Sequence, residues 1–455
     1  MASKRSPTEA HGLLSSDQKT TYESSQESDK IQRSGVGLDL SMPTISLFIL
    51  GKIAGVGILA LPKAVSDTGI WGVFLLLIYF AGSIYSGLIL ARNWNMLIER
   101  DPRVGTEISR DPYPLMAFHA FGIYGRWLGA AVLYSSIIFG VTADILLVSE
   151  NLQILFRQLN INLAFCYWLP IVTYLVCPLT WFGTPKDFWL IGITAGLTSM
   201  LSSLLVIIGT SFDVSSRQTL DPVHVDFWPF CAALGLVAFA YSGQSVFPTL
   251  QHDMKRPANF RKSVVLGYII VALCYFPSSL FAYWVYGAEF QRTGGDNVFD
   301  FFTSQPVVIM CILSLNTHLI LSVVIDTNPF NQDIEDYVGI PYDFTWKRCI
   351  SRSLVMTVVL LLAFLVPKFS TFISIFGAPL TVFGNFVIPS LVHLKLRSML
   401  AGTEERWIGY FELSLHIVVN TLAVIGGSHQ LQQGCIFLLI IIVLLLLSHV
   451  FLICP

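Results

Sequence analysis

The stretch that decides the fold reads GKIAGVGILALP and occupies residues 51–62. It lies inside the first apolar segment long enough to cross a bilayer, which runs roughly from Ser41 to Val65. Gly55 and Gly57, separated by one residue, weaken a helix in lipid, where no water pairs the freed backbone groups. Such an interruption is tolerated where it faces protein or a wet cavity. The stretch therefore predicts a spanning helix that is broken near its middle.

The composition is typical of a membrane protein with many spans. Of the 455 residues, 54% are hydrophobic and 12% are charged, whereas about 25% are charged in soluble proteins. The apolar residues form runs of roughly 20, each about 30 Å long as a helix. Twelve candidate runs lie at residues 43–65, 70–91, 127–153, 164–182, 188–211, 227–249, 263–286, 306–327, 350–366, 370–393, 408–426 and 435–453.

The segments around these runs define the expected domains. Residues 1–40 are polar and lack an apolar face, which predicts a disordered tail. The main transmembrane domain is expected over 41–430, and the run at 435–453 is an additional C-terminal span. The eight cysteines show no metal-ligand spacing, and no cofactor or metal is expected. The net charge of −2 and the lack of a basic patch predict no nucleic-acid partner.

The distribution of Lys and Arg predicts the orientation of the chain. With the N-terminus in the cytoplasm, the inside segments carry twenty Lys and Arg residues. The outside loops then carry four, which are Arg157, Arg217, Arg292 and Lys368. Positive residues favour the cytoplasmic side of a membrane protein. The bias therefore predicts a multi-pass protein with a cytoplasmic N-terminus.

A second interruption lies in the sixth apolar run. Residues 239–248 read FAYSGQSVFP, so polar residues, a glycine and a proline interrupt an apolar helix. The first and sixth runs each begin a group of five. A five-plus-five inverted repeat places its two discontinuous helices at these positions. The two interruptions together predict an all-α membrane protein built on such a repeat.

Four stretches in order carry a resemblance to a known family. They are GVGILALPKA at 55–64, FAYSGQSVFP at 239–248 with DMKRP at 253–257, AFG at 120–122 with GR at 125–126, and NP at 328–329 followed by Glu335. Over roughly residues 43–427 the chain resembles the amino acid/auxin permease family, and the second stretch is most similar to the vesicular inhibitory and proton-coupled amino acid transporters. The resemblance implies a leucine-transporter-like fold with broken helices 1 and 6, usually with eleven spans rather than the twelve candidates found here.

An amino acid substrate carries a carboxylate and an ammonium, and the two breaks offer groups for both. Freed N–H groups at the first break, and the positive end of the half-helix that follows it, suit the carboxylate. Freed carbonyls at the second break suit the ammonium. We therefore expect the substrate, most readily a small neutral amino acid, to contact Ala54, Gly55, Val56, Gly57 and Ile58 together with Phe239, Ala240, Tyr241, Ser242 and Gly243.

Ionisable groups inside the spans are candidates for coupling transport to an ion. Four such residues are Lys52, Asp144, His318 and Asp326, the last of them near the cytoplasmic interface. Each can carry a coupling proton, pair with a neighbour or extend to the membrane interface. Sodium would instead need carbonyls of the first break plus polar groups of helix 8, where Ser314, Asn316, Thr317 and Ser322 are available. The similarity to proton-coupled transporters favours protons, and sodium stays the alternative.

The tail carries one sorting signal. Glu9, Leu13 and Leu14 match an acidic dileucine motif, which adaptor proteins read in cytoplasmic tails. This motif predicts an endolysosomal or vesicular location, and the plasma membrane is the alternative.

Three other classes of protein are alternatives. An amino acid sensor would use the same pocket with little flux. A sugar-type transporter of the major facilitator class would explain twelve spans, but it usually has a long central loop, and residues 251–262 form a short one. A membrane enzyme is the weakest alternative, since the sequence shows no nucleophile constellation or phosphate-binding loop.

Overall fold

The computed structural model describes residues 41–101, 104, 112–182, 188–216, 225–252, 254, 256–341, 344–366 and 368–400. The predicted disordered tail at 1–40 with its dileucine motif lies outside the described residues. So do the predicted spans at 408–426 and 435–453.

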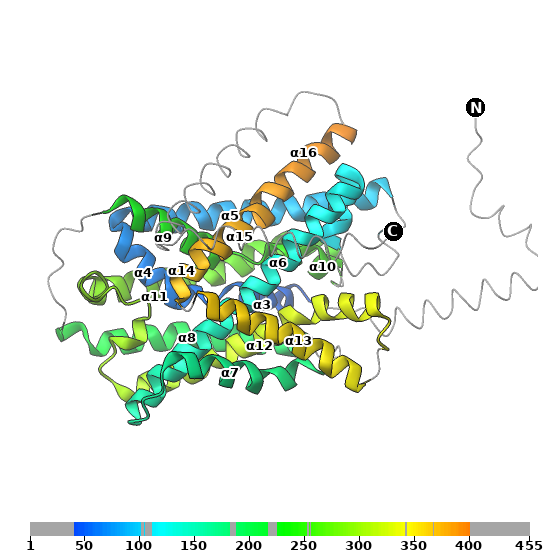
Figure 1. Ribbon diagram of the computed structural model, residues 1–455. Helices are drawn as coiled ribbons and strands as arrows, with labels where there is room; N and C mark the ends of the chain where they lie inside the picture. The colour runs from blue at the N-terminus through cyan, green and yellow to red at the C-terminus, as the bar shows by residue number, and fades with distance from the viewer. Residues whose placement is uncertain are drawn as a thin grey trace, which may run out of the picture.

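The regular elements of the described chain are helices, and most of them run along one common direction (Figure 1). The long helices are α5 (Ile70–Arg100), α6 (Pro112–Gln158), α7 (Phe165–Thr180), α8 (Phe188–Phe212), α11 (Phe260–Thr293), α12 (Gln305–Val338) and α13 (Trp346–Leu365). Helix α6 is kinked at Gly122, whose φ is 70°. Short 3₁₀ turns lie at η1 (Val214–Ser216), η3 (Pro257–Asn259) and η4 (Val298–Asp300).

These helices account for the first ten predicted spans. Among the described residues, eight helices are long and apolar enough to cross a membrane, and one bent pair adds a ninth. The remaining predicted span corresponds to α7, which is apolar but only 16 residues long and contains Pro170 and Pro178. The prediction of an all-α membrane protein is confirmed.

The first break divides the first span into α3 (Met42–Ile53) and α4 (Gly57–Thr68), which meet at an angle of 57°. Helix α3 begins at the N-cap Ser41, whose hydroxyl accepts from the N–H of Thr44. It ends where the Ala54 N–H reaches the carbonyl of Leu50. The chain turns over Gly55 and Val56 before α4 begins. The predicted interruption is therefore present.

The second break divides the sixth span into α9 (Phe227–Ala240) and α10 (Phe247–His252), with the 3₁₀ turn η2 (Gln244–Val246) between them. Gly243 has a φ of 131°, a conformation that side chains rarely allow. The sequence places glycine where the backbone requires it.

The tenth span contains two π-helical segments. It is built from α14 (Phe369–Phe372), η5 (Ile373–Gly377), α15 (Ala378–Val382), η6 (Phe383–Val387) and α16 (Ile388–Leu400). The π segments free side-chain and backbone groups for contacts with other helices. The Asn385 side-chain oxygen accepts the Ser245 N–H at 3.2 Å, and its carbonyl accepts from the Ser86 hydroxyl. The tenth span therefore holds the second break in place.

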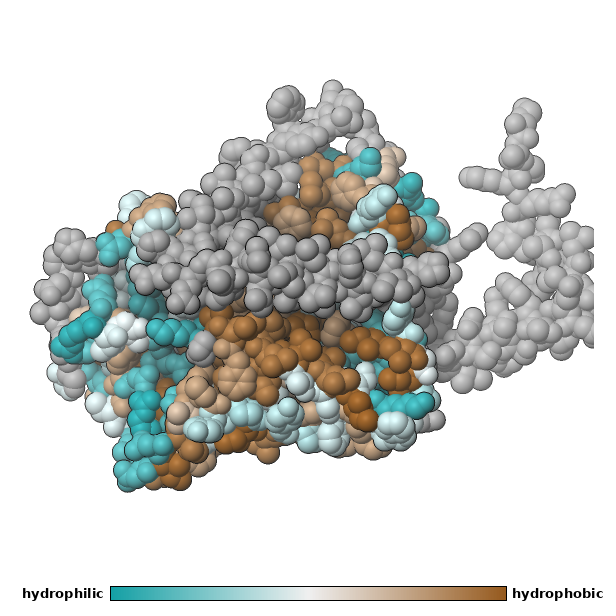
Figure 2. Space-filling view, viewed as in Figure 1, coloured by the Kyte–Doolittle hydropathy of each residue, from teal (hydrophilic) through white to brown (hydrophobic). Residues whose placement is uncertain are grey.

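Apolar side chains form a broad band across the visible face, and polar side chains gather toward its two ends (Figure 2). The outer surfaces of α7, α11 and α13 expose large aliphatic side chains, including Leu175, Leu273, Leu354 and Leu361. In water such exposure would be costly, whereas in a bilayer it faces lipid. The surface thus agrees with a multi-pass membrane protein.

Glycines bring α3 and α8 into backbone contact. A side-chain carbon at Gly51 would lie 2.5 Å from the carbonyl oxygen of Gly192 and 2.8 Å from the backbone nitrogen of Gly196. Small residues allow such close approach between membrane helices. The first half of the broken helix is therefore seated directly on α8.

We expect Gly51→Ala to lower the stability of the folded protein by about 1–3 kcal/mol, the usual cost of overpacking. The added carbon meets backbone atoms, which cannot rotate away. The measurement is the thermal unfolding midpoint in detergent. Gly140→Ala in α6 is the control, because a carbon added there meets nothing within 4 Å. Equal midpoints for the two variants would contradict the close packing of α3 on α8.

Candidate functional site

The first break exposes fewer backbone donors than the sequence predicts. The Gly55 N–H, expected to be free, lies 3.1 Å from the carbonyl of Ile53, and the Gly55 carbonyl accepts from the Ile58 N–H at 3.2 Å. The amides of Val56 and Gly57 stand at the start of α4, where a helix cannot pair its own first N–H groups. The donors that remain for a carboxylate therefore belong to the N-terminal end of α4.

The carbonyls of the second break also have partners within the protein. The Phe239 carbonyl accepts from the Ser242 N–H at 3.0 Å. The Tyr241 carbonyl accepts from the Gln244 side-chain amide at 3.0 Å and from the Tyr268 hydroxyl at 3.4 Å. The sequence predicts that these carbonyls are free to accept from a substrate ammonium. They are satisfied because buried carbonyls recruit nearby donors when no ligand supplies one.

Tyr275, from the middle of α11, connects the two breaks. Its hydroxyl lies 2.7 Å from the carbonyl oxygen of Ile53, the last residue of α3, and 3.1 Å from that of Ala240, the last residue of α9. Its side chain also packs against Gly57, where an added carbon would overlap the phenol oxygen. The glycine at 57 is therefore needed to make room for Tyr275. Sequence reasoning missed this residue, because nothing in the pattern of α11 distinguishes Tyr275 from its other tyrosines.

Tyr241 supplies a buried hydroxyl at the site. Its side chain is fully buried, and its hydroxyl makes no hydrogen bond within the described residues. Its ring contacts the Tyr275 ring edge-on, with centroids 5.4 Å apart. A buried polar group without a partner is costly, and it is expected where a ligand or water supplies the partner. The Tyr241 hydroxyl is thus available to a bound molecule.

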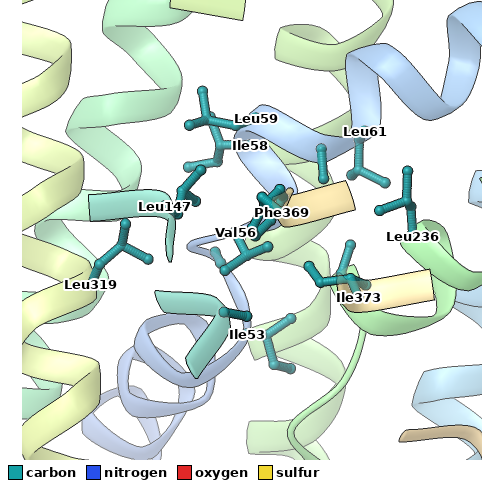
Figure 3. Close-up of a cluster of buried hydrophobic side chains, with 14 of the residues drawn as sticks. Ile53, Val56, Ile58, Leu59, Leu61, Leu147, Leu236, Leu319, Phe369 and Ile373 are labelled. Carbon is teal, nitrogen blue, oxygen red and sulfur yellow. The ribbon is translucent and has the colours of Figure 1, made fainter. Parts of the chain in front are cut away.

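The surroundings of the first break are apolar. Figure 3 shows Val56 at the break in a cluster of side chains from four other spans. The cluster includes Leu147 from α6, Leu236 from α9, Leu319 from α12, and Phe369 and Ile373 from the tenth span, all at most 4% exposed. A site with such a lining favours an uncharged side chain on its ligand.

Three charged groups lie together beside the first break. Lys52, in the last turn of α3, forms an ion pair with Asp326 of α12, and their side chains are 17% and 11% exposed. Asp144 of α6 is 7% exposed and interacts electrostatically with both. Its carboxylate makes no hydrogen bond within the part of the chain that the structure describes. The Lys52–Asp326 pair is neutral, and Asp144 is a second carboxyl group near it that forms no ion pair among the described residues.

His318 of α12 lies directly against the first break. Its Nδ1 is 3.0 Å from the Ala195 carbonyl and 2.8 Å from the Ser199 hydroxyl. A carbonyl only accepts, so Nδ1 carries the hydrogen and Nε2 of the neutral ring is an acceptor. A carbon added at Gly55 would overlap Nε2. The acceptor nitrogen thus faces the break, and position 55 has no room for a side chain.

The other candidate ion ligands do not converge on the break. The Ser314 hydroxyl donates to the Thr198 carbonyl at 3.0 Å. Thr317 is exposed on the outer face of α12, and its hydroxyl donates to the Leu313 carbonyl at 2.7 Å. Periodicity cannot reveal this, because a lipid-facing helix surface is as apolar as its core-facing one. Among the described residues, no group of three or more His, Cys, Asp or Glu side chains is placed to hold a metal.

Asn316 belongs to a chain of buried amides. Its side-chain oxygen accepts from the Asn151 amide of α6 at 2.8 Å, and the Asn151 oxygen accepts from the Asn297 amide at 2.9 Å. The Asn297 oxygen in turn accepts the Phe299 N–H at 3.0 Å. The chain joins the loop before α12 to two spans, so it has a structural role that the sequence did not indicate.

Comparison with known proteins decides the family. A model of the transmembrane amino acid transporter protein family matches residues 39–433. The chain belongs to this family. The amino acid transporter AVT1D of Arabidopsis thaliana is 25% identical over 82% of this chain, and AVT1E of the same plant is 22% identical over 83%. The chain spans 66% and 70% of the lengths of these two relatives.

Solved structures of two transporters share the fold. The crystal structure of MhsT in complex with L-phenylalanine aligns over 85% of this chain and 98% of its own, with a TM-score of 0.52 and 14% identity. A Na⁺-coupled sialic acid symporter in an outward-open state aligns over 86% and 89%, with a TM-score of 0.50 and 13% identity. The leucine-transporter-like fold predicted for this family member is confirmed, in place of the major facilitator alternative. A transporter family also agrees with the expectation that the chain is not an enzyme.

Proposed function

We propose that this member of the family carries small neutral amino acids across a membrane by alternating access, in symport with protons. The observation that carries the proposal is the meeting of the two broken helices. The N-terminal end of α4 and the C-terminal ends of α3 and α9 come together around Tyr275. Opposite ends of helix dipoles suit the two charged groups of an amino acid. The apolar lining around Val56 suits a small uncharged side chain.

The proton is the coupling ion in this proposal, and Asp144 is its carrier. The Lys52–Asp326 pair is neutral by itself, so Asp144 is the uncompensated charge of the group. A buried carboxylate without hydrogen bonds is strongly disfavoured until it is protonated. Sodium receives less support, because the hydroxyls of Ser314 and Thr317 are directed elsewhere.

The proposed orientation places the N-terminus in the cytoplasm, as the Lys and Arg distribution predicts. The dileucine motif at Glu9, Leu13 and Leu14 favours an endolysosomal or vesicular membrane, with adaptor proteins as the partners that read it. Replacement of both leucines by alanine should move the protein to the plasma membrane. An unchanged distribution would contradict this part of the proposal.

Uptake by reconstituted protein tests the function. Purified protein in vesicles is given labelled glycine, L-alanine and L-serine, with a larger panel for comparison. We expect accumulation above the outside concentration when the inside is alkaline, and no accumulation when the imposed gradient is sodium alone. Accumulation driven by a sodium gradient alone would show that sodium, and not the proton, is the coupling ion. Saturable binding without any flux would favour the sensor alternative.

A further inference from the structure

The Tyr275 hydroxyl occupies a position between two helix ends that is unusual for a neutral side chain. It has a single hydrogen, yet two carbonyl oxygens, those of Ile53 and Ala240, lie within hydrogen-bond distance of it. Each carbonyl ends a half-helix, where the helix dipole is negative. The side chain is fully buried and has no contact with bulk water. The two carbonyls at these helix ends can therefore accept more hydrogen bonds than the hydroxyl donates, and they favour a positively charged donor.

The same oxygen also faces the start of α4. A side-chain carbon at Gly57 would overlap it, and the Gly57 backbone interacts with it. One hydroxyl thus meets the negative ends of α3 and α9 on one side and the positive end of α4 on the other. The head of an amino acid carries complementary charges, with an ammonium for the negative ends and a carboxylate for the positive end.

We propose that the Tyr275 hydroxyl is a built-in competitor that the substrate's ammonium displaces from the carbonyls of Ile53 and Ala240, so that Tyr275 sets the affinity for amino acids. The inference rests on the proposed function. An ammonium brings three donors and a full charge. In its absence the two carbonyls share one hydroxyl hydrogen, and the Gly55 N–H is a further donor to the Ile53 carbonyl. The empty site is stabilised by the tyrosine, and the tyrosine's hydrogen bonds must be lost when the substrate binds.

The variant Tyr275→Phe removes the hydroxyl and keeps the aromatic ring, so it tests the hydroxyl alone. The phenyl ring keeps the contact with Tyr241, while the Ala240 carbonyl loses the hydroxyl donor and the Ile53 carbonyl keeps the Gly55 N–H. We expect the empty protein to unfold at a lower temperature, because the buried Ala240 carbonyl loses the hydroxyl as its donor. We also expect glycine, L-alanine or L-serine to bind about five-fold more tightly, since a typical neutral hydrogen bond no longer competes. The stabilisation by substrate should therefore be larger in the variant than in the wild type.

The control is Tyr283→Phe, on the same helix. The Tyr283 side chain is half-buried, and its hydroxyl makes no hydrogen bond within the described residues. The Tyr283→Phe variant should leave both the unfolding temperature and the affinity for amino acids unchanged. If the Tyr275→Phe variant is not recovered folded, Tyr275→Met tests the same point, because it also lacks the hydroxyl and adapts to irregular space.

Binding and thermal unfolding are measured for the wild type and the variants with the three amino acids as probes. Equal or weaker binding by Tyr275→Phe, with the wild type binding normally, overturns the inference and leaves the proposed function standing. Failure of the wild type to bind any of the three overturns the proposed substrate class, and the inference with it. Tighter binding together with a less stable empty protein supports the inference.

Discussion

Asp144→Asn is expected to abolish the accumulation of substrate that a pH gradient drives, while exchange of substrate across the membrane continues. With one proton carried per substrate, a gradient of one pH unit sustains about a ten-fold concentration ratio. An amide at this position cannot take up the proton, so the ratio should fall to about one. The Lys52–Asp326 pair remains intact, because the substitution removes only the uncompensated charge beside it.

The measurement compares labelled amino acid inside and outside vesicles at steady state, with and without the gradient. Counterflow with unlabelled substrate on the inside reports exchange without net proton movement. Glu99→Gln is the control, because this carboxylate is exposed at the end of α5. Retention of the full ten-fold ratio by Asp144→Asn would show that another group carries the proton, and His318 would be the next candidate.

Glu335→Gln is expected to cost the protein about 3–5 kcal/mol of stability, the usual effect of breaking a buried ion pair. The Arg352 guanidinium lies 2.5 Å and 3.1 Å from the two carboxylate oxygens of Glu335, and Arg348 lies 3.3 Å away. The three side chains are 1–4% exposed. Without the carboxylate, both guanidinium groups would lose the buried negative charge of Glu335.

Arg352 also binds the carbonyls of Thr180 and Phe182 at 2.5 Å and 2.9 Å, so the cluster ties the end of α7 to α12 and α13. The thermal unfolding midpoint and the yield of monodisperse protein measure the effect. Lys347→Gln, an exposed position beside Arg348, is the control and should behave as the wild type. A Glu335→Gln variant as stable as this control would mean that the charge of Glu335 is not needed to hold the cluster together.

The sequence predicted the two breaks because each depends on local chemistry. Gly243 adopts a φ of 131°, and the turn after α3 needs residues without bulk at 55 and 57. The partners of the breaks depend on how helices are rotated against one another. In a membrane the apolar pattern hardly distinguishes inner from outer faces. Tyr275 was therefore missed, and Thr317 was counted as a candidate ion ligand although it is exposed.

Charge pairing was predicted only in part. Lys52, Asp144 and His318 were recognised as unusual because charged or titratable residues inside spans are rare. Asp326 was placed near the cytoplasmic interface with pairing left open, and it forms an ion pair with Lys52. The position of an acidic residue along a helix gives its depth, but the helix that faces it is fixed by the packing of α3 against α12.

The chain of amides through Asn316, Asn151 and Asn297 has a mechanical consequence. It fastens the loop before α12 to α6, while α11 is fastened by Tyr275 to the two broken helices. Any tilt of α11 against α6 and α12 must then be absorbed between its last residue and Asn297. Gly294 lies in that interval with a φ of 63°, followed by Gly295. We therefore expect this short interval to bend when α11 tilts against α6 and α12.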